Sequence, residues 1–262
     1  GKAFVAGADV KFFVDKLRAN SFPDIYEFTA NGHDVLDKLE NSPKTTIALT
    51  TGLALGGGLE LALACDYRIG TRRTQFRFPE TSIGIYPGLG GSQRPARISG
   101  IPLARWAVLA GNFMDAKTAT DLGLVTNLVD VSDVDSMIAT LDSQGKPANK
   151  YPSKPQNPES KIAQFAESFY SDENLDSILN GNCPDGFDSE DKLVSRQMKS
   201  LSRTAPIALR MASELIDAAG ETNLAEGLSQ ELGKLEAIFS TDDALEGLSA
   251  LIEGRKPTYQ NS

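Results

Sequence analysis

Three consecutive glycines, Gly56 to Gly58, stand between a β-type segment and a helical segment and constrain the fold more than any other feature of this sequence. The residues before them, Thr45 to Thr51, form a β-type run, and the residues after them, Leu59 to Ala64, have helical composition. Glycine lets the backbone approach a ligand closely, and the N-terminus of a helix offers unpaired N–H donors with a favourable dipole. We therefore expect a strand–loop–helix unit whose backbone N–H groups can stabilise a developing oxyanion.

The order of the other segments indicates an α/β fold. Residues 65–70 and 75–78 are β-type stretches that follow the glycine run, and residues 125–129 are another strand candidate. Strands separated by helical stretches are typical of α/β proteins with crossover connections. Residues 143–158 are rich in Pro, Ser, Asn and Lys, which is typical of a linker or a long loop. The segments predicted to be helical after that loop are 159–170, 172–180, 188–203, 206–219, 222–239 and 241–253.

Two more glycine-rich segments flank this unit in the sequence, Ala6 to Asp9 and Pro79 to Gly91. Neither forms a known nucleotide-binding loop. No GxGxxG motif occurs, because Gly88-x-Gly90 continues to Gln93 where a third glycine is needed. The P-loop pattern GxxxxGK[ST] and the nucleophile elbow GxSxG are also absent from the sequence. The glycine-rich segments therefore do not form any of the known glycine-rich loops that bind nucleotide phosphates.

The overall composition excludes several classes of partner. Acidic residues outnumber basic ones by 35 to 26, which gives a formal net charge of −9 and predicts no nucleic-acid partner, since such a partner needs a clustered basic face. No apolar run approaches the roughly 18 residues that span a bilayer, so we predict no membrane insertion. The two cysteines, Cys65 and Cys183, belong to no CxxC pattern. We therefore expect no disulfide framework, no metal site and a reduced, cytoplasmic setting.

Taken together, the three glycine-rich segments, 6–9, 54–60 and 79–91, resemble the crotonase (enoyl-CoA hydratase/isomerase) superfamily in their order and spacing. The similarity covers residues 1 to about 130 and resumes from about 202 to 256. This resemblance implies a crotonase-like (ClpP/crotonase) α/β spiral of short strands and helices. It also implies a crotonase core at 1–130, an insertion or linker at 131–185, and a C-terminal helical trimerisation region at 186–262.

The resemblance further implies roles for individual residues. The backbone N–H groups of Ala8 and Gly57 would form the oxyanion hole for the thioester carbonyl of an acyl-CoA substrate. Glu60 and Glu80 match the two carboxylates of the hydratases, and Gly88 matches the glycine whose N–H helps to hold the attacking water. The residues expected to bind the CoA thioester, with Lys11 as a phosphate contact, are Ala6, Gly7, Ala8, Asp9, Val10, Lys11, Gly56, Gly57 and Pro87.

Two carboxylates suit the hydration of a double bond. Water adds at C3 and a proton adds at C2, so one group must activate water while a proton is delivered next to it. We expect Glu60 to orient and deprotonate the water and Glu80 to supply the C2 proton. No cofactor is expected, because coenzyme A is part of the substrate. The acyl-chain preference is expected to depend on the arrangement of Phe12, Phe13, Tyr86, Leu89 and Trp106.

Features outside the motifs keep other functions open. The stretch 131–201 is longer than the connection in simple hydratases. The segments Ala205 to Leu209 and Asp242 to Ala250 resemble the 3-hydroxyisobutyryl-CoA hydrolases, but those enzymes lack the glutamate at position 60 and carry an Asp near position 88. An enoyl-CoA isomerase can manage with one carboxylate, which Glu60 argues against. The first strands of the family fold are missing before Ala6, so we expect a fragment or one domain of a longer polypeptide.

The same resemblance suggests what the chain associates with. A helical C-terminal region implies a homotrimer or a homohexamer. A 3-hydroxyacyl-CoA dehydrogenase fused to or associated with the chain would make it part of a fatty-acid β-oxidation enzyme. A non-catalytic module of such a multifunctional protein remains an alternative to an active hydratase.

Overall fold

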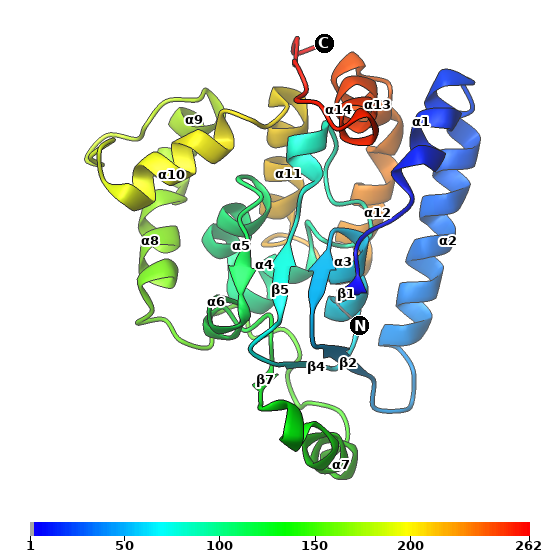
Figure 1. Cartoon of the computed structure of the whole chain (residues 1–262), viewed down its shortest axis with the longest axis vertical. Helices are drawn as coiled ribbons and strands as arrows, with labels where there is room; N and C mark the ends of the chain where they lie inside the picture. The colour runs from blue at the N-terminus through cyan, green and yellow to red at the C-terminus, as the bar shows by residue number, and fades with distance from the viewer. Residues whose placement is uncertain (1–2) are drawn as a thin grey trace.

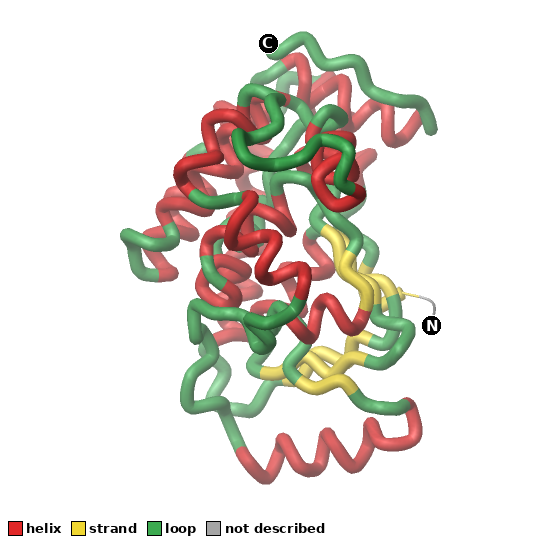
Figure 2. Tube along the Cα trace, turned by 90° about the vertical axis from the view of Figure 1, so that its left-hand side faces the viewer, coloured by secondary structure: helices red, strands yellow, loops and turns green. Residues whose placement is uncertain are grey.

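The computed structural model describes residues 3–262, whose strands form two small sheets (Figure 1). One sheet has the strand order β1-β3-β5-β6 and the other has the order β2-β4-β7. Neighbouring strands are parallel except for β5 and β6, which are antiparallel. Successive strands from β1 to β5 alternate between the two sheets, and Figure 2 shows these strands as two small groups. The strands are β1 (Ala3–Val5), β2 (Ile47–Thr50), β3 (Leu53–Leu55), β4 (Tyr67–Gly70), β5 (Gln75–Arg77), β6 (Met114–Asp115) and β7 (Asn127–Leu128).

The strand that leads into the glycine run is β3, which differs from the prediction. The predicted run Thr45 to Thr51 contains β2, and β2 pairs with β4 in the other sheet from Ile47 opposite Tyr67 to Thr50 opposite Gly70. Gly52 then turns the chain into β3, which lies between β1 and β5. A three-residue strand is too short to show a period in the sequence, which is why it was missed.

The helices cover the sheets and make up most of the chain. The predicted helices after residue 159 are confirmed, with ends shifted by a few residues, except for the one over 222–239. That segment divides at Lys234, directly after Gly233, because glycine is a poor helix former. The helices are α1 (Val10–Arg18), α2 (Phe22–Glu40), α3 (Gly57–Ala64), α4 (Arg94–Ser99), α5 (Ile101–Val108), α6 (Ala116–Asp121), α7 (Val134–Gln144), α8 (Lys161–Phe169), α9 (Asp172–Leu179), α10 (Lys192–Leu201), α11 (Pro206–Ala218), α12 (Leu224–Gly233), α13 (Leu235–Phe239) and α14 (Asp242–Glu253), with 3-10 helices η1 (Glu80–Ile83) and η2 (Val131–Asp133).

The last helices return onto the first ones and thereby close the region around the glycine run. α14 packs on α1 and on η1, while α12 and α13 pack on α2. On the other side of the molecule, α8 packs on α5 (Figure 1). Residues 145–160 contain no helix or strand, which confirms the long loop predicted there. Every α-helix except α7 and α12 contributes buried residues to one hydrophobic cluster. The predicted domain boundaries at 130/131 and 185/186 stay predictions.

Gly58→Ala is expected to destabilise the fold strongly. α3 passes so close to β1 that a Cβ on Gly58 would overlap the backbone carbonyl of Val5. Backbone cannot move aside as a flexible side chain can, so we expect the free energy of unfolding to fall by about 3 kcal/mol. Urea denaturation measures this change, with Gly233→Ala as the control, because a Cβ there meets nothing within 4 Å. Equal stability of the two variants would contradict this description of the α3–β1 contact.

None of the helices in residues 3–262 is both long enough and apolar enough to cross a membrane.

Candidate active site

A cavity of about 380 Å³ lies where the glycine-rich loops meet the C-terminal helices. One wall consists of backbone from residues 6–8 and 55–57, and the carboxyl-bearing residues Glu60 and Glu80 also line it. The opposite wall is apolar and comes from α1, α2, α13 and α14; its large side chains are Phe13, Phe28, Leu235, Phe239, Leu248 and Leu251. Polar groups at one end of an apolar cavity are typical of a ligand-binding site.

The backbones of Ala8 and Gly57 lie close together at the polar end of the cavity. Gly57 is the first residue of α3, and a helix has no internal acceptor for the N–H of its first residue. A Cβ placed on Gly57 would lie 4.0 Å from the backbone nitrogen of Ala8. No backbone hydrogen bond between loops, turns or caps of residues 3–262 uses the N–H of Ala8 or of Gly57. Gly56, the N-cap of α3, has a positive φ of +50°, a backbone conformation that favours glycine, and α3 begins directly after it.

Glu60 lies in the first turn of α3 and is 2% exposed. Its Oε1 atom accepts hydrogen bonds from the backbone nitrogens of Leu89 and Gly91, both at 2.7 Å. Burial raises the pKa of Glu60 to about 7, and these two hydrogen bonds oppose that rise because they favour the charged form. Its Oε2 atom lies near Gly57, and a Cβ added to Gly57 would be 3.8 Å from this oxygen. Glu60 can therefore act as a base near neutral pH.

Glu80 begins η1 and is 7% exposed. Its Oε1 atom lies beside Gly56, where an added Cβ would be only 2.5 Å away. Within residues 3–262, its Oε2 atom has no hydrogen-bond partner. Burial, and next the charge of nearby Glu60, raise the pKa of Glu80 well above its usual value. Glu80 therefore keeps its proton to a higher pH than an ordinary carboxyl group, which suits it to act as an acid.

A third buried carboxyl group, Glu231 on α12, was not predicted from the sequence. Glu231 is fully buried and accepts hydrogen bonds from the backbone nitrogens of Gly90, at 2.5 Å, and Ser92, at 3.3 Å, and from the Ser92 hydroxyl. Burial, and then the charge of Glu60, raise its pKa to about 8. One signal could have identified it: Glu231 takes an apolar-face position on its helix, in register with Leu224, Leu228 and Leu235.

The loop that follows Gly88 is therefore held from two sides. The backbone N–H groups of Leu89 and Gly91 donate to Glu60, and those of Gly90 and Ser92 donate to Glu231. Gly88 itself lines the cavity, and its carbonyl oxygen lies 2.8 Å from Nε2 of His33. Successive N–H groups of this loop therefore donate alternately to Glu60 and to Glu231. The two carboxyl groups together hold the position of the loop backbone.

The predicted substrate-binding residues divide into two groups. Ala6, Gly7, Ala8, Val10, Gly56 and Gly57 all line the cavity, whereas Asp9, Lys11 and Pro87 do not. Asp9 is the N-cap of α1 and accepts from the Lys11 backbone, and the Lys11 ammonium pairs with Asp15. Pro87 is buried beside Gly91.

The predicted acyl-pocket residues also divide. Phe13, Tyr86 and Leu89 line the cavity. Phe12 does not, and Trp106 lines a different cavity. The helices α13 and α14 supply apolar side chains in their place, including Phe239, whose ring stacks on Phe13 at 5.4 Å between centroids. These helices lie over 140 residues beyond the glycine loops, so local sequence patterns could not connect them.

Thermal stability is expected to fall as the pH rises from about 5 to about 9. The folded-state pKa values of Glu60, about 7, and Glu231, about 8, both exceed the ordinary carboxyl value of 4.5. A group with a raised folded-state pKa binds its proton more tightly in the folded protein. Its stability contribution is therefore fully present below pH 4.5 and is lost as the pH passes through 7 and 8.

Circular dichroism melting curves across this pH range measure the change in Tm. Glu231→Gln removes one titrating group, so its Tm should fall less steeply with pH than that of the wild type. The exposed Glu173, on α9, provides the matched control, and Glu173→Gln should follow the wild-type slope. A Tm that is constant or rises over the range would show that these carboxyl groups are not buried in neutral form.

No group of three or more His, Cys, Asp or Glu side chains in residues 3–262 is arranged to hold a metal ion.

Comparisons with known proteins identify the family of the chain. The sequence profile of the enoyl-CoA hydratase/isomerase family matches residues 1–262. A probable enoyl-CoA hydratase of Mycobacterium bovis is 31% identical over 258 residues, which cover 98% of this chain and 76% of that protein. An enoyl-CoA isomerase/hydratase of Mycosarcoma maydis is 30% identical over 260 residues, covering 99% of this chain and 73% of that protein.

Solved structures support the fold. An enoyl-CoA hydratase from Rhodobacter sphaeroides has a TM-score of 0.80 at 23% identity, covering 99% of this chain and 76% of that one. A carnitinyl-CoA dehydratase from Mycobacterium thermoresistibile has a TM-score of 0.79 at 19% identity, covering 99% of this chain and 75% of that one. The predicted crotonase-like fold is therefore confirmed.

Proposed function

The chain belongs to the enoyl-CoA hydratase/isomerase family, and we propose that it adds water across the 2,3 double bond of an enoyl-CoA thioester. The observation that carries this proposal is the pair of buried carboxyl groups at the glycine run, with Glu80 beside Gly56 and Glu60 toward Gly57. Hydration needs a base for the water and an acid for C2, both next to one double bond. The two groups suit these tasks, since Glu60 titrates near neutrality and the pKa of Glu80 is raised well above its ordinary value.

In the proposed mechanism, the N–H groups of Ala8 and Gly57 donate to the thioester carbonyl oxygen and polarise the conjugated double bond. Oε1 of Glu60 is occupied by two amides, so its Oε2 atom takes a proton from the attacking water. The water oxygen bonds to C3, and the π electrons move toward C2 and the carbonyl. Glu80 then donates its proton to C2, and a proton passes from Glu60 to Glu80 to restore both groups. No redox partner or separate cofactor is needed for this balance.

Three alternatives are weaker on specific grounds. An isomerase needs one carboxyl group to move a proton between carbons, which leaves the second buried carboxyl without a task. Acyl-CoA hydrolysis in the related hydrolases goes with an Asp near position 88, where this chain has Gly88. A non-catalytic module has no need for Glu80, because a buried carboxyl oxygen without a partner costs folding free energy.

The apolar wall of the cavity supports an acyl chain as the part of the substrate beyond the thioester. Phe13, Leu235, Phe239, Leu248 and Leu251 can all contact such a chain. The predicted roles of Asp9, Lys11 and Pro87 in CoA binding gain no support from their positions. We therefore assign the recognition of the thioester end to residues 6–8, Gly56 and Gly57.

Crotonyl-CoA incubated with the purified chain tests the proposal. Loss of the conjugated enoyl-thioester absorbance is followed together with the release of free thiol. Absorbance loss without thiol is the expected result. Thiol release would identify a hydrolase, and a gain of absorbance from a 3-enoyl-CoA without any hydration of crotonyl-CoA would identify an isomerase. Binding of CoA with neither signal would favour the non-catalytic module.

The pH dependence of the reaction gives a second test. Glu60 must be ionised to accept a proton from water, so kcat/KM for crotonyl-CoA should rise as the pH increases through about 7. Because Glu80 must stay protonated, kcat/KM should fall again at higher pH. A stopped-flow pH series at saturating and at low substrate measures both limbs. A profile that is flat from about pH 5 to 9 would contradict the assignment of Glu60 as the base.

A further inference from the structure

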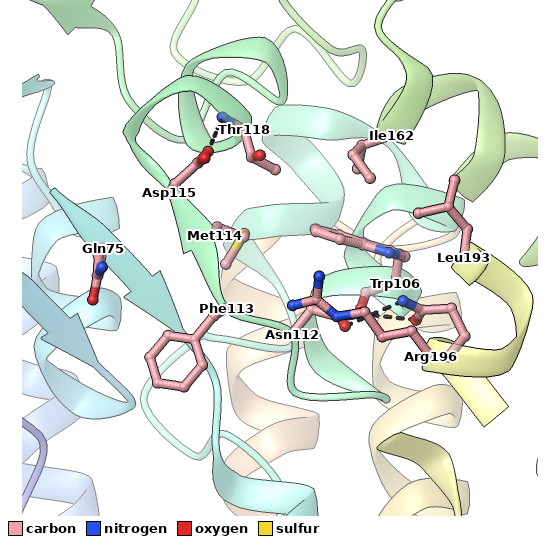
Figure 3. A pocket seen from close by; sticks show the side chains of 11 residues that line it. Gln75, Trp106, Asn112, Phe113, Met114, Asp115, Thr118, Ile162, Leu193 and Arg196 are labelled. Atoms are coloured by element: carbon pink, nitrogen blue, oxygen red, sulfur yellow. Dashed lines mark hydrogen bonds between the residues drawn. The ribbon is translucent and has the colours of Figure 1, made fainter. Parts of the chain in front are cut away.

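A second cavity, of about 460 Å³, lies between α5, β6, α6, α8 and α10. Figure 3 shows its lining side chains, which include Trp106, Met114, Ile162, Leu193 and Arg196. None of its lining residues also lines the candidate active site. Its volume lies within the range of small-molecule sites, roughly 300–1,000 Å³. The hydration mechanism gives this cavity no role.

Trp106 contributes a buried polar group to this cavity that has no partner. Its side chain is 3% exposed, and no atom of residues 3–262 accepts a hydrogen bond from its Nε1. A buried indole N–H usually finds an acceptor. An acceptor from a bound molecule would complete the site.

The other buried polar groups in this cavity already bind one another. Asn112 Nδ2 donates to the carbonyl oxygen of Trp106 at 2.8 Å and to Oε1 of Gln197 at 2.9 Å. Gln197 Nε2 donates to Oδ1 of Asn112 at 3.2 Å, and the Tyr170 hydroxyl donates to Oε1 of Gln197 at 3.0 Å. This pair of amides is rigid and leaves no acceptor that could turn toward the indole.

Arg196 supplies a positive charge at the same cavity. Its side chain belongs to an exposed residue of α10, and within the part of the chain that the structure describes it forms no ion pair or hydrogen bond. The one acidic residue of the lining, Asp115, is engaged at the start of α6, where its carboxylate accepts from the Thr118 nitrogen at 2.8 Å. The cavity thus offers one free cation and one free neutral donor beside apolar walls.

We propose that this cavity binds a small monocarboxylate with a short apolar chain. One carboxylate oxygen accepts from the Trp106 indole N–H and the other from the Arg196 guanidinium, whose planar donors suit a carboxylate. The chain packs against Met114, Ile162 and Leu193. A phosphate is disfavoured, because its charge of about −1.5 to −2 exceeds that of the single cation and Asp115 adds repulsion.

Trp106 is the only tryptophan of the chain, so the single indole N–H resonance reports on this cavity alone. We therefore propose a titration of the ¹⁵N-labelled chain with hexanoate, followed by ¹H–¹⁵N correlation spectra. The expected result is a saturable downfield shift of that resonance, as a hydrogen bond to it forms. Hexanamide, which matches hexanoate in size but lacks its charge, should bind more weakly.

Arg196→Gln should weaken hexanoate binding by about fivefold, the upper range for an exposed ion pair. Arg203→Gln removes the same charge from an exposed residue outside the cavity and should leave the affinity unchanged. An indole resonance that does not move would overturn the proposal, and so would equal affinities for hexanoate and hexanamide. Equal affinities of the two arginine variants would do the same. None of these outcomes depends on hydratase activity, so the proposed function is tested separately.

Discussion

Glu80→Gln is expected to lower kcat for crotonyl-CoA hydration by about 10²- to 10⁴-fold, which is the usual contribution of a general acid. Glutamine matches the size of a protonated glutamic acid but cannot deliver a proton to C2. The raised pKa of Glu80 favours the neutral form of the wild-type group in the folded protein. The substitution should therefore leave the fold and the binding of substrate nearly unchanged, so that the loss falls on kcat and not on KM.

Steady-state kinetics with crotonyl-CoA measure this effect. The matched control is Glu173→Gln, which makes the same change at an exposed residue on α9, outside the cavity. Circular dichroism and the free energy of unfolding check that Glu80→Gln is folded. A folded Glu80→Gln that keeps more than about a tenth of the wild-type kcat would show that another group donates the proton.

Glu231→Gln is expected to lower both the stability and the activity of the protein, although Glu231 does not line the cavity. An amide has one oxygen, so its NH₂ group must face either the Gly90 nitrogen or the Ser92 nitrogen and hydroxyl, which now donate to the two oxygens of the carboxyl group. A buried donor left without an acceptor costs about 1–3 kcal/mol. We expect the free energy of unfolding to fall by about that amount.

The effect on activity should pass through the loop. Leu89 and Gly91 hold Oε1 of Glu60, and they alternate along the chain with the residues that Glu231 holds. Once the loop is free to tilt, Glu60 is less well placed, and we expect kcat to fall by about tenfold, equivalent to about 1.4 kcal/mol. Glu236→Gln, at an exposed position of α13, is the control in both measurements. Wild-type kcat in a Glu231→Gln variant of reduced stability would limit Glu231 to a purely structural role.

The parts of the site that could be predicted from the sequence are those that lie within a short segment. Gly57 and Glu60 are one helical turn apart, so a local motif fixes the oxyanion donor and the base together. Ala8 and Glu80 each belong to a compact glycine-rich segment of their own, and all of these residues line one cavity.

The parts that could not be predicted depend on segments far apart in the chain. Glu231 and Phe239 come from α12 and α13, which are distant from the glycine loops in sequence and meet them only through the tertiary fold. The phosphate contact expected of Lys11 stays a prediction; in the structure its exposed ammonium group pairs with Asp15 along α1. The strand β3 was missed for a similar reason, since three residues acquire strand geometry here through their neighbours β1 and β5.

Isotope labelling distinguishes hydration of the double bond from hydrolysis and from isomerisation. Crotonyl-CoA is converted by the chain in water enriched in oxygen-18, and mass spectrometry locates the label in the products. The mechanism of Glu60 and Glu80 predicts one labelled oxygen, at C3 of an intact 3-hydroxyacyl-CoA thioester. Label in the carboxylate of a released acid, or a rearranged enoyl-CoA without label, would contradict the account.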